Sequence, residues 1–545
     1  MLKKIPVGIE DFKEIITKDY YYIDKTKLIE ELLLEGSRVT LFTRPRRFGK
    51  TLNMSMLRYF FDIKNAENNK NLFKNLHIEK SPVFSEQGKY PVIFISMKGL
   101  TASTWKEVLK EISLKIKKLF KDYREIASSL DKYDILDFEK YILENDKLEE
   151  ADLKKSLQYL TELLHNHYKE KVVLLIDEYD SPIITAYEKG FYNEMKDFLR
   201  AFYGDVLKTN EHLQMGVLTG IIRVVQAGIF SDLNNFESYT ILNNQYSEYF
   251  GLLENEVENA LLNYNIEYKL DEVKSWYDGY NFGTKEIYNP LSILKYLKTK
   301  ELGAYWINTS GNILIKNLLI LSSPKTFEDL DKLVKGEELL IYLNQSIALG
   351  ENLTPNNLWE LMLFSGYLTI KEKINDTTYL VKIPNKEVNS FFRNLFVEIV
   401  FRGKNSIADL KKALQSKDVK AIIEIIEEVV LNAMSFYDTD SRYENPYQTL
   451  LAGFFYGLDE YLMHPNVEAG YGRADIILEP LIKSWTGYIF ELKRAKTTNI
   501  EKEVLEAYQQ IDKNKYENLL KTVGIKDIVK IGVAFDKKIV KSYTI

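Results

Sequence analysis

Short apolar runs alternate with longer helical stretches over the first 240 residues. The runs RVTLFT (38–43), YPVIFISM (90–97), KVVLLIDEYD (171–180) and GVLTG (216–220) have the length and composition of buried strands. Residues 51–61 place apolar side chains at helical spacing, and residues 104–170 are helical and rich in charge. Strands separated by helices indicate a parallel sheet, so the pattern predicts an α/β domain over residues 1–240.

The pattern changes twice further along the chain. Residues 241–390 are mostly helical, with interruptions at WYDGYNFG (276–283) and WINTSGN (306–312). Within them, LWELMLFSGYLTIKE (358–372) and TTYLVKIPN (377–385) predict a helix leading into a hairpin, a candidate winged-helix element. From about residue 440 we expect a helix, two strands, a further helix and a last strand. We therefore divide the chain into 1–240, 241–390 and 391–545.

Composition excludes several classes of site. The 545 residues include no cysteine, which rules out disulfides and thiolate metal sites. The five histidines are scattered, which argues against a histidine-based zinc site. The net charge of −6 argues against a globally basic nucleic-acid binder but leaves room for a local basic groove. The start MLKKIPVGIEDFKE lacks an apolar core, and no apolar run approaches the roughly 18 residues of a membrane span. We expect a cytoplasmic protein with no membrane partner.

The stretch TRPRRFGKT (43–51) ends as a phosphate-binding loop does but does not begin as one. Gly49, Lys50 and Thr51 stand between a predicted strand and a predicted helix, where backbone N–H groups face phosphates. The pattern G-x-x-x-x-G-K-[ST] requires a glycine where this chain has Arg44. The stretch is therefore a nucleotide site, a basic turn, or a phosphate loop built differently. The residues expected to bind nucleotide here are Arg46, Arg47, Phe48, Gly49, Lys50, Thr51 and Leu52.

A second motif, which is acidic, supports the interpretation of TRPRRFGKT as a nucleotide site. The apolar strand 172–176 runs into Asp177 and Glu178. With Thr51, Asp177 is expected to hold Mg²⁺, and Glu178 is expected to polarise the attacking water. The alternative is that Asp177 and Glu178 are only a charged strand end entering a loop. In LTGIIRVV (218–225), Thr219 is a candidate γ-phosphate sensor, and Arg223 is a candidate phosphate contact in cis or across a subunit boundary. A surface salt bridge is the alternative for Arg223.

The C-terminal region carries a separate set of charged residues. Glu491 and Lys493 lie two apart in GYIFELKRAK (487–496), so on a strand they share a face. Asp475 lies in the preceding strand, and antiparallel pairing brings it beside Glu491. Two carboxylates suit Mg²⁺ or Mn²⁺, which lowers the pKa of a bound water, while Lys493 positions the nucleophile or stabilises the transition state. A surface salt bridge is the alternative for this E-x-K.

The N-terminal motifs together resemble the AAA-ATPase-like family of bacterial and archaeal proteins. They are IPVGIEDFKEI, YYIDKTKLI, TRPRRFGKT, LLIDEYDSP, LTGIIRVVQAGIFSDLNN, WYDGYNFG, YNPLSIL and WINTSGN. In that family the loop commonly reads R-P-R-R-F-G-K-T, so the missing glycine is a shared feature. The resemblance spans roughly residues 1–320. It implies a P-loop NTPase sheet domain and ATP binding, with hydrolysis favoured by the presence of both Asp177 and Glu178.

The C-terminal motifs resemble the PD-(D/E)XK nuclease superfamily over about residues 440–525. The resemblance implies a restriction-endonuclease-like α/β fold with Asp475, Glu491 and Lys493 as its D…ExK set. The further positions that it suggests are Glu444 as an extra acid, with Glu468 as its competitor, Gln509 or Gln510 as a helical glutamine, and Gln448 where relatives often have histidine. Gln509 is the glutamine we assign to the catalytic set, together with Glu444 and Glu178.

The two resemblances together imply ATP-controlled, metal-dependent cleavage of nucleic acid. DNA is the expected substrate, and defence against mobile elements rests on family analogy alone. Three alternatives stay open: an ATP-dependent signalling or scaffold switch, a DNA-binding ATPase without cleavage, and a nuclease that never hydrolyses ATP. A homo-oligomer is considered because arginine fingers are often supplied by a neighbouring subunit.

Overall fold

The computed structural model contains two compact units. It describes residues 2–143, 148–223, 236–267, 270–307, 315, 318–319, 324–343, 355–401, 406–433, 446–455, 458–495, 499–536 and 539–544. The first unit comprises Met1–Gly311 and Leu340–Glu387, and the second comprises Asn312–Leu339 and Val388–Ile545. Most of the expected middle region, 241–390, belongs to the first unit, and the division expected at residues 240 and 390 stays a prediction.

A five-stranded parallel sheet forms the centre of the first unit. Its strands are β1 (Val39–Thr43), β2 (Val92–Ser96), β3 (Val172–Asp177), β4 (Leu213–Gly220) and β5 (Phe236–Tyr239), in the order β2-β3-β4-β1-β5. All pairings are parallel, so the carboxyl ends of the strands meet at one edge. The four strands expected from the sequence are confirmed, whereas β5 was not expected.

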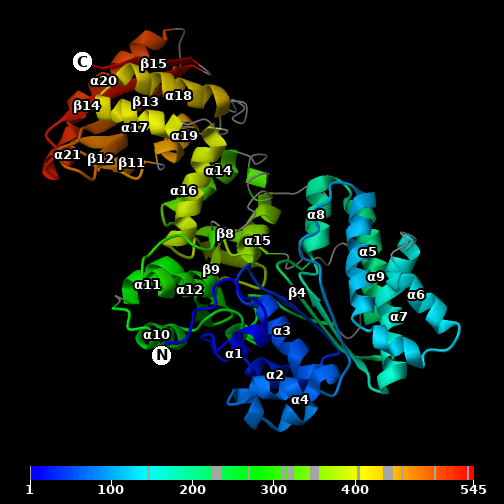
Figure 1. Cartoon of the computed structure of the whole chain (residues 1–545). Helices are drawn as coiled ribbons and strands as arrows, with labels where there is room; N and C mark the ends of the chain where they lie inside the picture. Colours follow the sequence, from blue (N-terminus) through cyan, green and yellow to red (C-terminus); the bar gives the residue numbers. More distant parts are fainter. Residues whose placement is uncertain are drawn as a thin grey trace. The chain divides into compact units, whose positions relative to one another are not determined.

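Helices cover both faces of this sheet (Figure 1). The helices up to β4 are α1 (Phe12–Thr17), α2 (Lys27–Glu35), α3 (Lys50–Phe61), α4 (Ala66–Lys70), α5 (Trp105–Lys121), α6 (Asp134–Ile142), α7 (Glu150–Tyr168), α8 (Ser181–Lys189) and α9 (Tyr192–Leu207). Helix α3 contacts β2, β3 and β4, whereas α5, α7 and α9 contact β2, β3 and β4 respectively and pack together on the other face. The phosphate-loop helix α3 therefore has a face of the sheet largely to itself.

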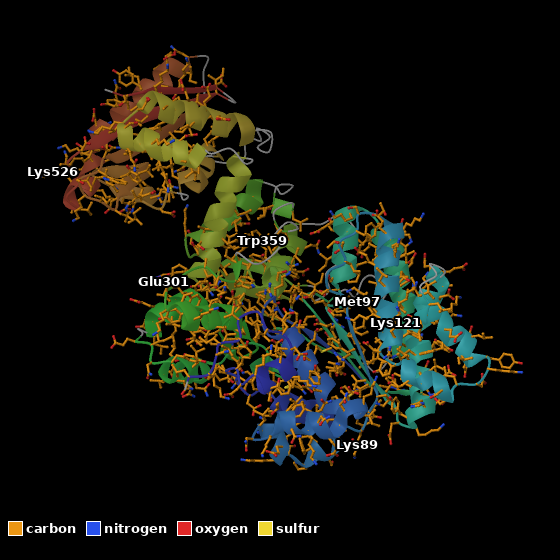
Figure 2. The ribbon with its side chains drawn as sticks, in the orientation of Figure 1. Lys89, Met97, Lys121, Glu301, Trp359 and Lys526 are labelled. Atoms are coloured by element: carbon orange, nitrogen blue, oxygen red, sulfur yellow. The ribbon has the colours of Figure 1, made fainter. Side chains whose placement is uncertain are left out.

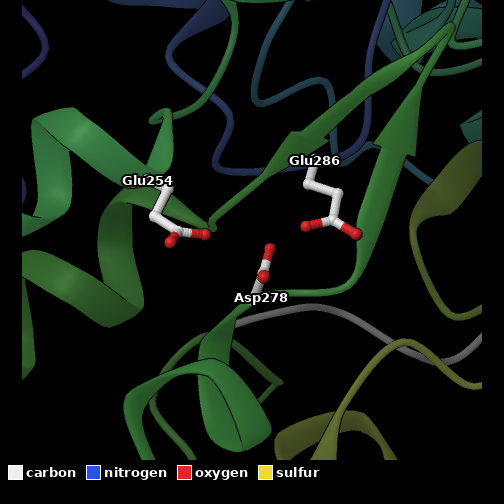
Figure 3. Close-up of side chains that lie close together, drawn as sticks. All are labelled: Glu254, Asp278 and Glu286. Atoms are coloured by element: carbon white, nitrogen blue, oxygen red, sulfur yellow. The ribbon is translucent and has the colours of Figure 1, made fainter. Parts of the chain in front are cut away.

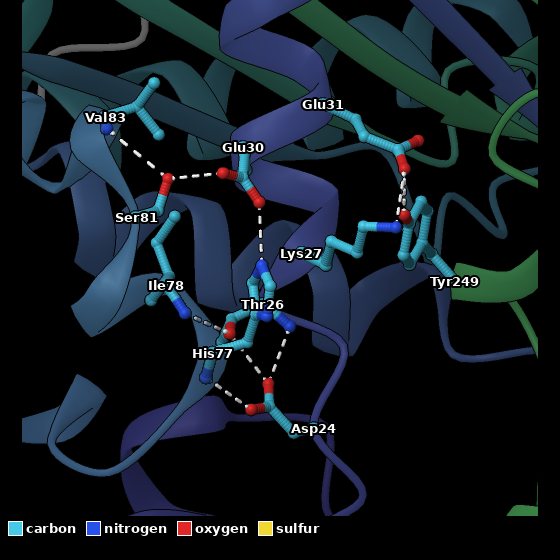
Figure 4. Close-up of polar contacts among 10 residues, drawn as sticks. All are labelled: Asp24, Thr26, Lys27, Glu30, Glu31, His77, Ile78, Ser81, Val83 and Tyr249. Atoms are coloured by element: carbon cyan, nitrogen blue, oxygen red, sulfur yellow. Dashed lines mark hydrogen bonds and ion pairs between the residues drawn. The ribbon is translucent and has the colours of Figure 1, made fainter.

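The segment before β2 is joined to α2 and to the residues just before it by polar contacts (Figure 4). The Asp24 carboxylate accepts the His77 N–H at 2.7 Å. Glu30 bonds the His77 ring at 2.7 Å and accepts the Ser81 hydroxyl at 2.7 Å. Helix α2 ends at Glu35, because Gly36 adopts the left-handed conformation (φ 70°) that closes a helix.

The middle region adds small hairpins to the first unit. After η6 (Ser247–Tyr249) come α10 (Glu254–Asn263), α11 (Leu270–Tyr277), β6 (Tyr280–Phe282), β7 (Lys285–Ile287) and α12 (Pro290–Thr299). The interruption expected at 276–283 is therefore a hairpin. The helix expected before a hairpin is also present, as α15 (Pro355–Ser365) followed by the antiparallel pair β9 (Thr369–Lys373) and β10 (Thr378–Lys382), with β8 (Leu339–Tyr342) beside β10. A role for it as a winged helix stays a prediction.

The second unit is built on a mixed five-stranded sheet. Its strands run in chain order as β11 (Tyr461–Ala469), β12 (Gly472–Pro480), β13 (Gly487–Arg494), β14 (Ile528–Asp536) and β15 (Ile539–Tyr543). Only β13 and β14 pair in parallel. Its helices are α14 (Pro324–Val334), α17 (Ser406–Ser416), α18 (Val419–Ala433), α19 (Pro446–Phe455), α20 (Ile500–Asn514) and α21 (Glu517–Thr522), with α16 (Lys386–Phe401) entering it. The sequence missed β11 and β15.

Apolar clusters lie on both faces of this second sheet. One contains Phe490 with residues of α17, α18 and α19, and the other contains Ile489 with residues of α20 and α21. Side chains separate by polarity as in any globular chain: Met97 and Trp359 are buried, whereas Lys89 and Lys121 are exposed (Figure 2). None of the helices in the described ranges combines the length and apolar character that a bilayer crossing needs.

Candidate nucleotide and metal sites

The phosphate loop connects β1 to α3, as the sequence predicts. Strand β1 is buried throughout and ends at Thr43, and α3 begins at Lys50. Gly49 precedes the helix with φ 84°, a left-handed conformation that glycine adopts without strain. A Cβ at Gly49 would meet no atom within 4 Å, so the space beside the N-terminus of α3 is open. Backbone N–H groups at a helix N-terminus favour an anion there.

Arg44 explains why this loop lacks its first glycine. The side chain is fully buried, and its guanidinium donates to the carbonyls of Thr43 and Tyr239 at 2.9 Å and of Tyr246 at 3.2 Å. It also lies over the Phe250 ring, 5.1 Å from the ring centroid. Burial lowers the pKa of Arg44 to about 9. The arginine therefore anchors the loop in the protein interior, where a glycine would leave three carbonyls without this donor.

The other loop residues divide into exposed and buried ones. Arg47 is exposed, has φ 67° and lies 3.5 Å from Glu10. Arg46 is half-buried, and its charge contributes to lowering the pKa of Lys50. Phe48 is fully buried against Tyr280 and Phe282 of the β6–β7 hairpin. Leu52 is half-buried in the first turn of α3. Phe48 thus fixes the loop against the hairpin, whereas Arg46 and Arg47 keep part of their side chains accessible.

Lys50 is a buried cation that contacts carbonyls only. Its ammonium donates to the Arg44 carbonyl at 2.9 Å and to the Pro45 carbonyl at 2.7 Å. Burial lowers its pKa to about 8, although the charges of Glu178, Asp180 and Asp177 oppose the shift. No carboxylate forms an ion pair with Lys50 in the described part of the chain. A buried ammonium without an anionic partner fits a site that takes an anion such as the phosphates of ATP.

Asp177 is the centre of the acidic side of this site. Its carboxylate accepts hydroxyl hydrogen bonds from Thr51 at 3.1 Å, Thr219 at 2.8 Å and Ser96 at 3.2 Å. Asp177 ends β3, Ser96 ends β2 and Thr219 lies near the end of β4, so parallel pairing brings them to one edge. The structure therefore places the predicted residues Thr51, Asp177 and Thr219 together. Sequence reasoning missed Ser96, which a polar residue closing the apolar strand VIFIS could have indicated.

Glu178 lies beside this cluster in an unusual backbone conformation. Its φ is 52°, a left-handed value that is unfavourable for a residue with a Cβ. Burial raises its pKa, and the charge of Lys50 is the largest effect that opposes this shift. Sequence reasoning also missed Asp180, whose buried carboxylate accepts the N–H groups of Ile221 and Ile222 at 2.7 and 2.9 Å. Asp180 thereby ties the loop after β3 to the end of β4.

Gly220 is required for that connection. A Cβ there would lie 2.6 Å from the Tyr179 ring and 2.7 Å from the Asp180 carboxylate. The glycine of LTG is thus a packing requirement. Arg223, three residues later, is half-buried, and its Nε is buried without a hydrogen-bond partner. The structure does not bring Arg223 into the group formed by Lys50, Thr51 and Asp177 through any contact of the described residues.

In the second unit, the alternation of side chains places the D…ExK residues on one face. Strands β12 and β13 pair antiparallel, with Ile476 opposite Phe490, so Asp475 and Glu491 occupy the next opposed positions. Phe490 faces the cluster with α17, α18 and α19, whereas Ile489 faces the cluster with α20 and α21. Glu491 and Lys493 share the parity of Ile489 and therefore face α20. The convergence expected from the sequence is present.

The two carboxylates are held by different partners. The Asp475 carboxylate accepts the Leu492 N–H at 2.8 Å, and one oxygen of Glu491 accepts a hydrogen bond from the Gln510 amide. The other oxygen of Glu491, Oε2, is buried without a partner. Burial raises the pKa of both groups, and the Asp475 charge adds to the increase for Glu491. A buried orphan carboxylate oxygen next to a second carboxylate fits a hard divalent cation.

The helical glutamine that meets the site is Gln510. Gln509, the residue assigned from the sequence, is exposed, because successive helical residues point about 100° apart and only one of the pair faces the sheet. Lys493 is half-buried, and its ammonium lies 3.6 Å from Glu506 of α20, a partner that the sequence did not indicate. Glu506 therefore restrains Lys493 on the α20 face.

The further acids and Gln448 have different outcomes. Glu444 lies outside the described residues. Glu468 is exposed on β11, where it pairs in register with Arg473. Gln448 of α19 is buried and donates to the Asn466 side chain at 2.7 Å and to the Asp475 carbonyl at 3.1 Å. Gln448 thus holds the backbone of Asp475.

Comparisons with known proteins support the two-domain architecture. Residues 6–230 match a family model described as predicted AAA-ATPase, and residues 442–544 match that of the PD-(D/E)XK nuclease superfamily. The chain is 25% identical over 549 residues to a protein of Azotobacter chroococcum mcd 1 described as an uncharacterized protein in the vnfD 5′ region, covering 98% of this chain and 97% of that one. The protein thus combines an N-terminal AAA-ATPase-like domain with a C-terminal domain of the PD-(D/E)XK nuclease superfamily.

Proposed function

We propose that this protein binds and hydrolyses ATP and cleaves DNA by a metal-dependent reaction. The observation that carries the proposal is the orphan oxygen of Glu491, which lies on the same face as Asp475 and Lys493. Such an unpartnered buried carboxylate oxygen costs free energy in the isolated chain and is stabilised by a cation. Family membership supplies the reaction class, and the geometry supplies the residues.

In the nuclease domain, each residue has a separate role. Asp475 and Glu491 hold a Mg²⁺ or Mn²⁺ ion, and Gln510 orients Glu491 through its hydrogen bond. When bound, such an ion lowers the pKa of water and neutralises phosphoryl charge. Lys493 donates a proton or a hydrogen bond to the scissile phosphate, and Glu506 limits its motion.

In the ATPase-like domain, Lys50 and the acid cluster would have different roles toward bound ATP. Lys50 leaves the Arg44 and Pro45 carbonyls and neutralises phosphate charge, while Gly49 leaves room for the phosphates. Thr51 and Asp177 hold the Mg²⁺ that accompanies ATP, which supplies charge neutralisation at the phosphates. Glu178 orients water, and its raised pKa favours proton uptake from that water.

A cleavage assay with matched variants tests the proposal. Purified protein is incubated with plasmid DNA, linear DNA and RNA in Mg²⁺ or Mn²⁺, with and without ATP. We expect DNA cleavage that Glu491→Gln abolishes and that Glu501→Gln, an exposed change on α20, preserves. Lys50→Ala is expected to remove the effect of ATP.

The rival functions give different results in this assay. Absence of cleavage with every nucleic acid and both metals overturns the nuclease and leaves a nucleotide-driven switch. DNA binding that persists in Glu491→Gln without cleavage by the unaltered protein indicates a DNA-binding ATPase. Cleavage that is unchanged in Glu178→Gln, together with loss of ATP binding in Lys50→Ala, indicates a nuclease controlled by nucleotide binding alone.

A further inference from the structure

The WYDGYNFG segment belongs to neither site, although it carries a buried acid. Asp278 follows α11 directly, and its carboxylate lies next to those of Glu254 in the first turn of α10 and Glu286 of β7. Figure 3 shows the three side chains converging on one point from these three elements. One oxygen of each carboxylate lies within 4.8 Å of the others.

The oxygens of the three carboxylates are close enough together to share one divalent cation such as Ca²⁺. Calcium binds oxygen at about 2.3–2.6 Å, so two ligands on one ion lie at most roughly 5 Å apart. Magnesium binds at about 2.0–2.1 Å and requires closer ligands in octahedral geometry. Oxygens within 4.8 Å of one another fit within the span of one Ca²⁺ coordination shell.

Two buried polar atoms beside the cluster have no partner. Asp278 is only 7% exposed, and its Oδ1 makes no hydrogen bond. The Tyr288 hydroxyl is also buried and unpartnered. It lies close enough to the cluster that the charges of Asp278, Glu254 and Glu286 add to the upward shift that burial causes in its pKa. Buried oxygens without hydrogen-bond partners beside three carboxylates indicate a missing ligand that accepts electron pairs, such as a cation.

The neighbouring lysines neutralise the cluster only in part. Lys274 pairs with Glu254 at 2.6 Å, whereas Lys285 pairs with Glu248 at 2.6 Å. Three carboxylates and one ammonium leave a net charge of about −2 when all are ionised, which one divalent cation balances. Lys274 does not contact Asp278 or Glu286 within ion-pair distance in the described residues, so those carboxylates stay open to an ion.

We propose that Glu254, Asp278 and Glu286 form a binding site for a divalent cation of the Ca²⁺ class, separate from the nucleotide and nuclease sites. The bound ion cross-links α10, the end of α11 and β7. Through the same hairpin, Tyr280 and Phe282 of β6 pack on Phe48 of the phosphate loop. A cation bound at this position therefore makes the β6–β7 hairpin, against which the phosphate loop packs, more rigid.

Calorimetric titration of the full chain with CaCl₂ tests this site. The protein carries Asp475→Asn, which weakens metal binding at the nuclease site, and contains no nucleotide. We expect one Ca²⁺ per chain with a dissociation constant of about 10⁻³ M or tighter. Glu286→Gln, an exposed change with little risk to folding, is expected to weaken binding at least tenfold. Glu254→Gln is expected to do the same, and Glu272→Gln, an exposed acid on α11, serves as the matched control.

One further variant and a luminescence measurement separate a cation site from a simple ion-pair cluster. Lys274→Met removes the competing ammonium and is expected to tighten Ca²⁺ binding severalfold, with circular dichroism confirming the fold. Terbium luminescence excited through Tyr288 or Trp276 is expected to depend on Asp278. The proposal is overturned if Ca²⁺ stoichiometry and affinity are unchanged in both Glu254→Gln and Glu286→Gln, or if the Asp475→Asn chain binds no Ca²⁺ at millimolar concentration.

Discussion

The region around Asp177 and the region around Glu491 differ in how their buried charges are accommodated. Around Asp177, three hydroxyls already donate to the carboxylate, and Lys50 is held by two carbonyls. Around Glu491, one carboxylate oxygen has no partner and burial raises its pKa. The first region is therefore organised without a ligand, whereas the second leaves one carboxylate oxygen open for the proposed cation. Changes in the first should act on affinity, and changes in the second on chemistry and on metal dependence.

The largest expected effect follows from Glu491→Gln. The amide keeps the shape but loses the charge that holds a cation, so cleavage is expected to fall about 10³-fold, the equivalent of several kcal/mol of transition-state stabilisation. Because a buried, destabilised charge is removed, the metal-free stability should not fall. A variant that retains cleavage, measured against Glu501→Gln in plasmid nicking, would sink the assignment.

Arg44→Gly tests whether Arg44, which stands where the usual phosphate-loop pattern has its first glycine, is needed to hold the loop in place. The change creates the usual phosphate-loop pattern but removes a buried guanidinium that donates to three carbonyls. We expect destabilisation by about 3 kcal/mol or more, because buried carbonyls lose a charged donor. Denaturant unfolding monitors this, with Arg47→Gly as the exposed control. Equal stability of the two variants would refute the role of Arg44 as an anchor.

Lys50→Ala should weaken ATP binding by about 10–100-fold, the value of a charged hydrogen bond of about 1.5–3 kcal/mol. Thr51 and Asp177 remain paired, so the fold should persist. Fluorescent ATP-analogue titration measures the change, and Arg47→Ala is the matched removal of a positive charge from the same loop. An equal loss of ATP affinity in both variants would indicate that the positive charge of the loop as a whole, and not Lys50 itself, determines binding.

Gln510→Ala and Gln509→Ala separate two adjacent positions. Only Gln510 bonds Glu491, so its removal is expected to lower metal affinity or cleavage by about 10–100-fold, as other residues that orient metal ligands do. Gln509 is exposed, and its removal should leave both unchanged. Metal titrations of cleavage rate decide between them, and the reverse ranking would contradict the geometry.

The smallest expected effect is a pH dependence of ATP binding. The pKa of Lys50 is lowered to about 8 by burial, and phosphate binding requires the ammonium form. Affinity should be constant below pH 7 and fall as pH rises through 8, by at most about tenfold per pH unit. Titrations between pH 6.5 and 9, compared with Lys50→Arg, measure it. A rise of affinity across this range would exclude Lys50 as the titrating group.

Local sequence patterns predicted a large part of this architecture. Four apolar runs became four strands of one parallel sheet, and the i, i+2 spacing of Glu491 and Lys493 placed both on one face of β13. The strands β5, β11 and β15 escaped because short or polar edge segments carry little periodic signal. Ser96 escaped because its contact with Asp177 depends on a neighbour distant in sequence, and the choice between Gln509 and Gln510 depended on packing against the sheet.

The sequence alone determined which chemistry is available: a GKT before a helix, an acid pair after a buried strand, and a D…ExK set, because these depend on spacing along one element. Only the tertiary structure decided how each charge is accommodated. It placed Arg44 in the interior, selected Gln510 over Gln509, and brought Glu254, Asp278 and Glu286 together. The physical reason is that burial and partnership depend on packing between elements, which spacing within one element does not specify.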